Sequence, residues 1–364
     1  MNKKVLIFMP SIEGGGVEKN LFLVTNFLVK KIKKITLITI SKKFKKKFHK
    51  SVEFITLSSN IWDRYGRKFK YFLALILLIK EILKNRNLIV FSFQANVYCI
   101  VICKLFGVKV ISRSNSAPIG WSKNWLKRYI FKIVLNLADK VMVNSKEFKK
   151  DLKREFNVDA ICIYNPLNVK KIIKKKKKKT SSIFKSKKKL KILNIGRFTE
   201  QKDQILLLKS LKYLEKDLNY EAILIGKGVL RFNLNKYLKK NDLNDKIKKL
   251  NFVDNPYNLL KQTDIFVLSS KFEGLPNVLL EALVLNKFVI SSDCPTGPKE
   301  ILLNGKGGLL FKTGSYKDLT KKILYYSKNK NKCNKLLKVA VKSLDRFDYK
   351  KNLMKYYNLI SSSM

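Results

Sequence analysis

Histidine is almost absent from this sequence of 364 residues. The single copy, His49, lies in a lysine-rich segment, so we expect no catalytic triad built on histidine. No D-x-D motif occurs either, so the closely spaced carboxylates that commonly hold a divalent metal on a nucleotide diphosphate are missing. We predict that the protein needs no metal and no other cofactor.

Cysteines are few, and long apolar runs are missing. The five cysteines are scattered and odd in number, which favours a reduced, cytoplasmic compartment over a disulfide framework or a zinc site. The longest apolar stretch, 71–79, is far shorter than the ~20 residues that span a bilayer. The run 5–9 is also too short for a signal peptide. The sequence therefore predicts no transmembrane helix.

Negative charge is scarce. Lys and Arg number 78 against 26 Asp and Glu, which gives a formal net charge of +52, and nearly all of the cations are lysine. The lysines are spread along every segment, so they fit a genome-wide compositional bias as well as attraction to nucleic acid or to an anionic lipid leaflet. The hydrophobic fraction of 46% fits a globular protein, and the length allows two domains.

Short apolar runs alternate with helical segments along the chain. In the first half we expect strands at 4–9, 35–40, 52–57, 88–91, 109–112, 140–144 and 160–164. The alternation restarts at residue 190, with further strands at 220–225, 247–252, 266–270 and 288–292. Strands that alternate with helices indicate βαβ units and parallel sheets. The predicted fold class is α/β, with two Rossmann-like domains that face each other across a cleft.

The composition divides the chain into four regions. Residues 1–169 are expected to form the N-terminal Rossmann-like domain, and residues 190–335 the C-terminal one. Between them, 170–189 contains six consecutive lysines, whose like charges repel and stay solvated, so we expect an interdomain linker. Contact of this stretch with a membrane or another polyanion is the alternative. Residues 336–364 are a helical segment and a candidate to pack back on the N-terminal domain.

One stretch brings a strand end, a turn and a helix start together. The predicted strand 266–270 leads into a turn, and Pro276 suits the first turn of the helix 277–286 that follows. Open α/β sheets bind ligands at the carboxyl ends of their strands, and a helix N-terminus favours an anion. Glu273 and Glu281 flank this place, so we expect a polyhydroxylated, phosphorylated ligand. The alternative is an ordinary carboxylate at a helix start and a solvated one within the helix.

Two cations and a glycine loop lie at other predicted strand ends. Arg197 follows Gly196 at the end of the strand that begins at residue 190, and Lys202 lies five residues further on. A rigid guanidinium fork and a point charge together suit a diphosphate. Three glycines, 14–16, join a strand to a helix, where bare backbone can approach phosphate oxygens or simply make a tight turn.

Together these pieces resemble the retaining glycosyltransferases of family 4, which have the GT-B fold. The likeness covers nearly the whole chain and is strongest in the second half. It rests on the glycine loop with Val17 and Glu18, on Gly196-Arg197 with residues 201–203, on Gly226-Lys227-Gly228, on Glu273 and Glu281 with seven residues between them, and on residues 292–300.

The resemblance implies roles for the matching positions. Arg197 and Lys202 would hold the donor diphosphate and stabilise the leaving nucleotide, and Glu273 would grip the sugar, so these are the expected catalytic residues. Glu281 would accept hydrogen bonds from the ribose. The other expected donor-binding residues are Gly15, Gly16, Gly196, Gly226, Gly274, Leu275, Pro276, Asn277 and Val278.

The resemblance also implies substrates and a location. The donor would be a nucleotide-diphosphate sugar, with UDP and a hexose or N-acetylhexosamine as our choice. The acceptor would be a growing glycan on a polyprenyl diphosphate, at the inner face of the cytoplasmic membrane, in bacterial polysaccharide assembly such as that of capsule or lipopolysaccharide. Many relatives place a histidine near the sugar where this sequence has Arg113 and Asn115, which become the acceptor-side candidates.

One predicted helix, 121–137, is compatible with lying on anionic lipid. An ordinary half-buried helix is the alternative reading of the same pattern. The residues that suggest a lipid contact are Trp121, Lys123, Trp125, Lys127 and Arg128.

Two functions from other classes compete with sugar transfer. A nucleic-acid-binding protein would use the net charge, but no helix-turn-helix, zinc or RNP-type pattern occurs, so we do not expect a nucleic-acid partner. A nucleotide-sugar epimerase on the same fold would rely on acidic and histidine residues that are scarce in this chain.

Overall fold

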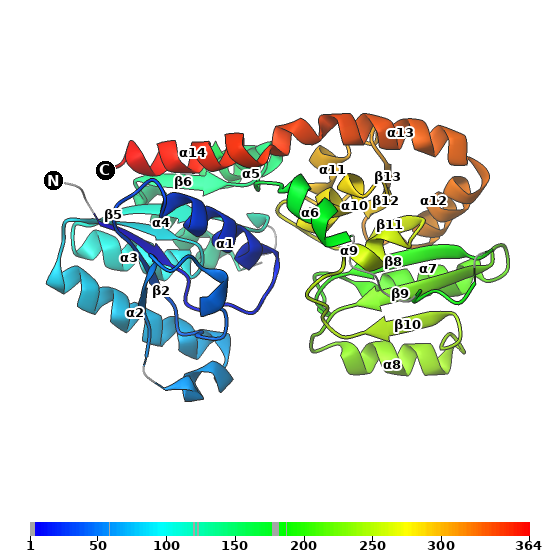
Figure 1. Cartoon of the computed structure of the whole chain (residues 1–364), viewed down its shortest axis with the longest axis horizontal. Helices are drawn as coiled ribbons and strands as arrows, with labels where there is room; N and C mark the ends of the chain where they lie inside the picture. Colours follow the sequence, from blue (N-terminus) through cyan, green and yellow to red (C-terminus); the bar gives the residue numbers. More distant parts are fainter. Residues whose placement is uncertain (1–3, 58, 119–120, 122–123, 177–181, 187) are drawn as a thin grey trace. The chain divides into compact units, whose positions relative to one another are not determined.

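The chain folds around two separate parallel sheets (Figure 1). The structure is a computed structural model and describes residues 4–57, 59–118, 121, 124–176, 182–186 and 188–364. The first unit contains Met1–Pro166 together with Tyr349–Met364, and the second contains Leu167–Asp348. The predicted α/β class, with two Rossmann-like parallel-sheet domains, is confirmed.

Seven strands form the first sheet, in the order β3-β2-β1-β4-β5-β6-β7. Every pairing in it is parallel. Because helices cover both faces, its central strands are buried throughout and read as continuous apolar runs rather than alternating ones. The strands are β1 (Lys4–Phe8), β2 (Ile35–Ile38), β3 (Glu53–Ile55), β4 (Leu88–Ser92), β5 (Lys109–Arg113), β6 (Lys140–Val143) and β7 (Ala160–Cys162).

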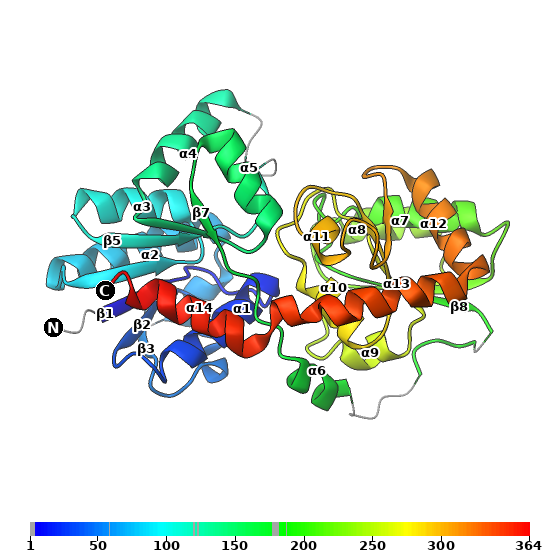
Figure 2. The ribbon, with the colours of Figure 1, turned by 90° about the horizontal axis from the view of Figure 1, so that it is seen from above.

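Two layers of helices cover this sheet. On one face lie α2 (Arg67–Lys84), α3 (Asn96–Leu105), α4 (Trp125–Leu137) and α5 (Lys146–Phe156), whose apolar residues share one core cluster. On the other face lie α1 (Gly16–Leu28) and the C-terminal helix α14 (Tyr349–Ser361). Figure 2 shows α14 running alongside α1. Short 3-10 turns occur at Lys45–Lys47 and Asn60–Arg64.

Six strands form the second sheet, in the order β10-β9-β8-β11-β12-β13, and all of its pairings are parallel. Its strands are β8 (Leu190–Ile195), β9 (Tyr220–Ile225), β10 (Ile247–Leu250), β11 (Ile265–Leu268), β12 (Phe288–Ser292) and β13 (Leu309–Phe311). The helices are α6 (Val169–Lys176), α7 (Gln204–Leu214), α8 (Arg231–Lys240), α9 (Tyr257–Lys261), α10 (Asn277–Val284), α11 (Pro298–Ile301), α12 (Tyr316–Lys328) and α13 (Lys330–Lys342), followed by a 3-10 turn, Ser343–Phe347.

The boundaries differ from the expected ones around the lysine-rich stretch. The first eight residues from Val169 onward form α6, which packs on α9 and α10 through a buried Ile172. Further on, the Glu221 carboxylate accepts hydrogen bonds from the backbone N–H groups of Lys185 and Ser186, at 2.7 and 2.8 Å. The stretch 170–189 therefore contains a helix and an anchored segment of the second unit, while Lys177–Lys179 lie outside the described residues.

The expected C-terminal segment 336–364 belongs to both units. Its first part continues α13, which packs on β12 and α10 of the second unit. Its last part is α14, whose apolar side chains complete the core of the first unit. Within the described residues, no helix combines the length and the apolar character needed to cross a membrane.

Candidate active site

Two backbone loops touch each other at the carboxyl ends of β8 and β9. The Gly196 and Phe198 N–H groups donate to the carbonyls of Ile225 and Lys227, at 3.0 and 2.9 Å. A Cβ on Gly226 would lie only 1.9 Å from the Gly196 oxygen, so no larger residue fits. The glycine pair predicted from the sequence thus brings the two strand ends into direct contact, and Arg197 emerges from this junction.

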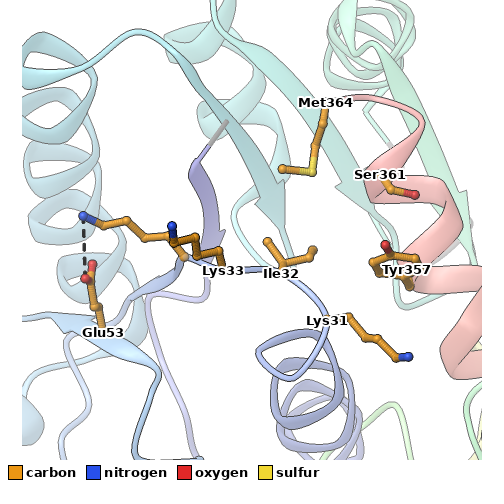
Figure 3. Close-up of a pocket in the computed structure, with 8 residues that line it drawn as sticks. Lys31, Ile32, Lys33, Glu53, Tyr357, Ser361 and Met364 are labelled. Atoms are coloured by element: carbon orange, nitrogen blue, oxygen red, sulfur yellow. Dashed lines mark ion pairs between the residues drawn. The ribbon is translucent and has the colours of Figure 1, made fainter. Parts of the chain in front are cut away.

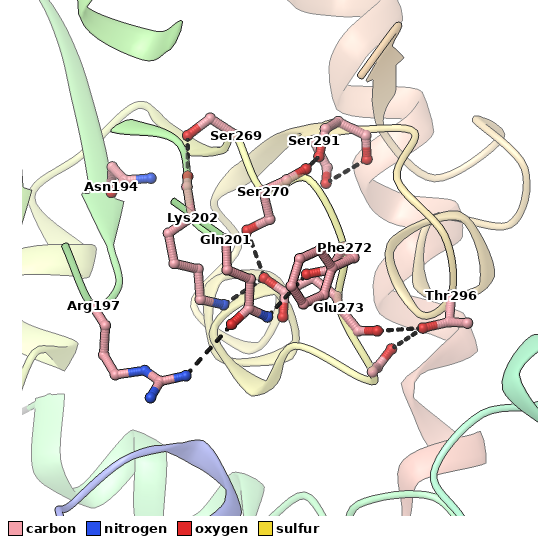
Figure 4. A network of polar contacts seen from close by, with 12 residues as sticks. Asn194, Arg197, Gln201, Lys202, Ser269, Ser270, Phe272, Glu273, Ser291 and Thr296 are labelled. Carbon is pink, nitrogen blue, oxygen red and sulfur yellow. Dashed lines mark hydrogen bonds and ion pairs between the residues drawn. The ribbon is translucent and has the colours of Figure 1, made fainter. Parts of the chain in front are cut away.

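Lys202 and Glu273 form the central ion pair of the second unit (Figure 4). Their side chains are only 16% and 6% exposed. The same Glu273 oxygen accepts a hydrogen bond of 2.6 Å from the hydroxyl of Ser270. A partly buried ion pair with an added hydrogen bond is rigid, because moving either charge away would leave the other buried and unpaired.

Tertiary contacts position Lys202 between β8 and α7. Its carbonyl accepts a hydrogen bond of 2.8 Å from the Ser269 hydroxyl at the end of β11. The next residue, Asp203, caps α7, since its carboxylate accepts from the Leu206 N–H at 3.3 Å. The lysine is therefore fixed at the carboxyl edge of the sheet by β11 on one side and by the start of α7 on the other.

Arg197 differs from Lys202 in being exposed. Its guanidinium makes one long hydrogen bond, 3.4 Å, to the side-chain oxygen of Gln201. Gln201 is itself held, because its amide donates to the carbonyl of Phe272 at 3.0 Å. The arrangement leaves a charged fork at the surface beside the loop that carries Glu273, as Figure 4 shows.

The loop from Phe272 to Asn277 is shaped by the segment that follows β12. The Thr296 hydroxyl donates to the carbonyls of Glu273 and Gly274, at 2.6 and 3.2 Å. Gly297 has φ +66, and a Cβ there would lie 1.8 Å from the Gly274 oxygen. Leu275 and Pro276 then lead into α10, whose first two residues are Asn277 and Val278.

Glu281 is buried one turn further along α10. The hydroxyl of Tyr257, the first residue of α9, donates to its carboxylate at 3.2 Å. Burial and the negative charge of Glu281 raise the pKa of Tyr257 well above its usual value, so the hydroxyl stays protonated and remains a donor. Tyr257 was not among the predicted site residues, and only its place at a helix start marks it in the sequence.

Three further residues near Glu273 were also missed. Ser270 is the polar residue that ends a buried strand, a signal that the sequence does contain. Cys294 is buried, and burial, with a contribution from the Glu273 charge, raises its pKa to about 12, so it stays a neutral thiol. Thr296 donates a hydrogen bond to the Glu273 backbone carbonyl, and no local sequence pattern predicts that contact.

The glycine loop of the first unit surrounds a carboxylate of its own chain. Gly15 is the N-cap of α1, and Glu18 in the first turn of that helix is buried. Glu18 accepts a hydrogen bond of 3.3 Å from the Glu13 N–H, and its carboxylate would lie 2.8 Å from a Cβ on Gly15. Gly15 and Gly16 belong to the first unit, whereas every other predicted donor-binding residue belongs to the second.

Arg113 is completely buried in the first unit. Its Nε donates to the Tyr356 hydroxyl of α14 at 3.2 Å, and one terminal nitrogen donates to Asn165 at 2.9 Å. The other terminal nitrogen donates to Asn115, and the guanidinium lies over the Phe93 ring. Arg113 therefore joins β5 to α14, and of the two acceptor-side candidates only Asn115 is partly exposed.

A cavity of about 630 Å³ lies elsewhere in the first unit (Figure 3). It is at the amino ends of β2 and β3, which begin at Ile35 and Glu53, so it lies at the sheet edge opposite to that where parallel sheets bind ligands. Lys34 and Glu53 form an ion pair of 3.7 Å across part of its wall. None of the described residues that line this cavity is a predicted site residue.

No group of three or more His, Cys, Asp or Glu side chains suited to hold a metal occurs in the part of the chain that the structure describes. The charged residues that lie together at the carboxyl edge of the second sheet are Arg197, Lys202 and Glu273.

Comparison with known proteins identifies the fold of the chain and the sequence family that its second unit matches. The sequence model of the family described as "Glycosyl transferases group 1" matches residues 175–342, which include every predicted site residue of the second unit. A computed superposition pairs 99% of the chain with all of Anabaena HepE, crystallised with UDP and glucose, at a TM-score of 0.78 and 17% identity. The chain therefore has the GT-B fold, and its residues 175–342 match a glycosyltransferase family.

Two curated relatives differ in how much they share with this chain. An uncharacterized glycosyltransferase of Methanocaldococcus jannaschii is 36% identical over 47% of the chain and 44% of its own length. A second relative, from Campylobacter jejuni, is 25% identical over 97% of the chain and 99% of its own length. It is named as an N-acetylgalactosamine-N,N'-diacetylbacillosaminyl-diphospho-undecaprenol 4-alpha-N-acetylgalactosaminyltransferase.

Proposed function

We propose that this protein is a glycosyltransferase that moves a hexose or N-acetylhexosamine from a UDP-sugar to a growing glycan carried on a polyprenyl diphosphate, with retention at the anomeric carbon, as in family 4. The observation that carries the proposal is the exposed Arg197 beside the Lys202–Glu273 pair at the carboxyl edge of the second sheet. Support for the substrates comes from the UDP bound to HepE and from the undecaprenol-linked acceptor in the name of the Campylobacter relative.

Arg197 and Lys202 bind the donor diphosphate. The Arg197 guanidinium is exposed and can form a two-pronged contact with phosphate oxygens. An ammonium has three N–H donors, so Lys202 can hold Glu273 and a phosphate oxygen at the same time. Because the sequence has no D-x-D motif, these two cations take the charge that a divalent metal carries in other transferases.

The two glutamates bind different parts of the donor. Glu273 already accepts hydrogen bonds from Lys202 and Ser270, and its remaining lone pairs accept from sugar hydroxyls. Glu281 lies on the helix that follows and accepts from the ribose hydroxyls, with the Tyr257 hydroxyl fixing its orientation.

The transfer proceeds on one face of the sugar. The bond between the anomeric carbon and the diphosphate oxygen breaks while the acceptor hydroxyl oxygen bonds to the same carbon from the same side. The acceptor proton passes to the departing diphosphate oxygen, so atoms and charge balance without a protein nucleophile. The cations stabilise the charge that develops on that oxygen.

The acceptor is a lipid-linked glycan in surface polysaccharide assembly, for which Asn115 of the first unit is the side-chain candidate. The enzyme would then work at the inner face of the cytoplasmic membrane. Two other relatives support this role: one is named for capsular polysaccharide biosynthesis in Staphylococcus aureus and the other for amylovoran biosynthesis in Erwinia amylovora.

Calorimetric titration with UDP, GDP and a short DNA duplex tests the proposal. UDP binding to the wild type should persist at ~0.5 M salt, a concentration that screens the attraction between exposed charges. Arg197→Ala should weaken UDP binding about tenfold to a hundredfold, since a hydrogen bond to a charged group is worth ~1.5–3 kcal/mol. Arg154→Ala, which removes an exposed arginine of the first unit, is the matched control and should bind UDP like the wild type.

A screen of UDP- and GDP-sugars for slow donor hydrolysis then identifies the sugar. Salt-sensitive binding of DNA without UDP or GDP binding would instead support the nucleic-acid-binding alternative. Conversion of a UDP-sugar to its epimer without release of UDP would support the epimerase alternative. Either result would overturn the transfer proposal.

A further inference from the structure

Three helices of the first unit are apolar on both sides. The inner sides of α2, α3 and α4 pack on the sheet through residues such as Leu78, Ile100 and Leu135. A helix at a protein surface normally carries polar residues on the side away from the core. Here the outer sides carry large apolar residues as well, and neighbouring helices are in contact from α2 to α3 and from α3 to α4.

These outer residues lie on three helices that contact one another in sequence, and we call them together the outer apolar face. On α2 and α3 they recur at intervals of three, four or seven residues, and on α4 they form two neighbouring rows spaced by three or four residues, so they line up along each helix. The most exposed are Leu105 and Trp125, at 77% and 76%. The full set is Phe69, Phe72, Ile76 and Leu83 on α2, Tyr98, Val101 and Leu105 on α3, and Trp125, Leu126, Tyr129, Ile130, Ile133 and Leu137 on α4.

The charge of this region is strongly one-sided. Residues 61–137 contain fourteen lysines and arginines and only two acidic residues, Asp63 and Glu81. Glu81 is already paired with Lys4 and Lys84. Exposed lysines stand among the apolar residues of the outer face, at positions 68, 80, 84, 127 and 132. Asp139 and Glu155, from outside this range, are likewise paired, with Lys104 and Arg128. Apolar rows flanked by cations, with the nearby carboxylates already paired, are the composition of a surface that lies on anionic lipid.

We propose that the outer apolar face docks on an anionic lipid bilayer, with its aromatic and aliphatic side chains at the level of the lipid headgroups. A second copy of the chain is a poorer occupant, because a symmetric contact would bring two basic faces together and lysine is depleted at protein interfaces. Nucleic acid would match the lysines and leave the rows of leucine and isoleucine exposed. Lipid docking rests on the proposed function in one respect only: the proposed function explains why docking would be useful, since it brings the protein to a lipid-linked acceptor.

The structure also changes which residues of the α4 region face the lipid. Trp121 points inward: its ring packs against Phe131 and Phe156, and its N–H donates to the Ser116 carbonyl at 2.9 Å. Arg128 is paired with Glu155 at 2.6 Å. Lys123 lies outside the described residues. The face therefore depends on Trp125 and on two helices, α2 and α3, that the sequence pattern did not single out.

Sedimentation with lipid vesicles tests the proposal. The wild type at low salt should sediment with vesicles containing one-third phosphatidylglycerol and stay in the supernatant with pure phosphatidylcholine. The triple variant Phe72→Glu/Leu105→Glu/Leu126→Glu places a carboxylate on each of the three helices at positions more than half exposed, so the fold should tolerate it. Its partition to the anionic vesicles should fall by roughly a hundredfold or more.

A charge-matched control separates the face from the net charge. Tyr213→Glu/Tyr325→Glu/Val339→Glu makes the same change in charge at exposed apolar positions of the second unit, and it should sediment like the wild type. Equal sedimentation of the two triple variants would overturn the proposal, as would a wild type that binds duplex DNA and ignores the vesicles. UDP affinity, measured alongside, should be the same in both variants, so a failure of the transfer proposal is visible separately.

Trp125 provides a direct readout of contact. Its exposed indole should shift to shorter emission wavelength on vesicle binding and be quenched by lipids brominated near the headgroup. The third tryptophan, Trp62, stacks on Phe69 of the outer apolar face, so the readout uses a Trp62→Phe background. In that background Trp125→Phe should bind the vesicles and lose most of this signal, because Trp121 packs against the core. A shift that persists in Trp125→Phe would contradict the docking geometry.

Discussion

At the scale of single residues, Glu273 and Glu281 have different surroundings although only seven residues separate them. Glu273 contacts a lysine and a serine hydroxyl at the sheet edge, whereas Glu281 accepts from a tyrosine within the helical layer. In the proposed reaction, Glu273 would contact the sugar and act on the leaving group through Lys202. Glu281 is a hydrogen-bond acceptor whose position is fixed by Tyr257 and does not depend on Lys202.

Alanine at each glutamate should therefore give different kinetic losses. Glu273→Ala should lower kcat by about a hundredfold and change UDP affinity by less than about threefold, because Lys202 keeps its charge but loses its fixed position. Glu281→Ala should weaken UDP binding by about tenfold with a smaller change in kcat. Steady-state kinetics with calorimetry measures both. Equal and mild effects would mean that the stretch is only a buried helix start.

Gly297 should be the least replaceable glycine of the second unit. Gly297→Ala combines a positive φ with a Cβ 1.8 Å from the Gly274 oxygen, so we expect a loss of at least about 3 kcal/mol in the free energy of unfolding. Gly314→Ala has a positive φ but no neighbour within 4 Å, and it should cost about 1 kcal/mol. Gly66→Ala has neither problem and should be nearly neutral. Urea unfolding measures the series, and similar losses at Gly297 and Gly314 would contradict it.

At the scale of secondary structure, the C-terminal helix α14 is part of the first unit's core. Leu353, Tyr356 and Ile360 pack against strands that are more than two hundred residues away in the sequence. Tyr356 also supplies the oxygen that receives the Arg113 Nε–H. The helix thus contributes both apolar packing and the partner of a buried cation.

Loss of one hydroxyl on this helix should be measurable. Tyr356→Phe leaves a buried guanidinium N–H without its acceptor, which should lower the free energy of unfolding by about 1.5–3 kcal/mol. Tyr357→Phe removes the hydroxyl of the next residue, which lines the cavity of Figure 3, and should cost less than about 0.5 kcal/mol. Hydrogen exchange at β5, together with urea unfolding, distinguishes the two. A loss at Tyr357 as large as that at Tyr356 would contradict the role given to Arg113.

The elements also show what a sequence can and cannot predict. Buried parallel strands such as β4 and β11 are plain apolar runs, so the fold class was predictable. The helix expected at 121–137 begins at Trp125, because Asn124 caps it, and α6 was concealed by its lysines. The pairing of Lys202 with Glu273 joins residues 71 positions apart, and no local pattern reports such a contact. The motif placed these residues at the site, and the structure supplied their partners.

At the scale of the whole molecule, the few carboxylates are shared among many lysines. Glu215 accepts from Lys212 at 2.8 Å and from Lys246 at 2.7 Å. Burial pushes the pKa of Glu215 upward, but the hydrogen bonds and charges of the two lysines outweigh burial and hold it below its usual value. With a net charge of +52, protonation of such carboxylates leaves the lysine repulsion uncompensated.

Stability should therefore fall on the acid side. A carboxylate whose pKa is lower in the folded state stabilises the fold above its unfolded pKa, ~4.3 for Glu, and this contribution disappears as the pH falls through the folded value. Glu215→Gln should lower the Tm by about 2–4 °C at neutral pH and leave it unchanged at an acid pH at which the wild-type carboxylate is already protonated. Thermal melts at the two pH values check this, and an equal loss at both would assign the effect to packing.

The position of α14 at the end of the sequence also determines the order in which the two units can be completed during translation. A ribosome makes all of Leu167–Asp348 after the seven strands of the first sheet and before the helix that closes that sheet's second face. At ~5–20 residues per second, the first unit waits roughly 10–40 s without the α14 residue Tyr356 that contacts the Phe91 ring, while the second unit acquires every segment of its own core. The half of the enzyme that is made first is therefore finished last, and during that interval the nascent chain is most in need of a chaperone.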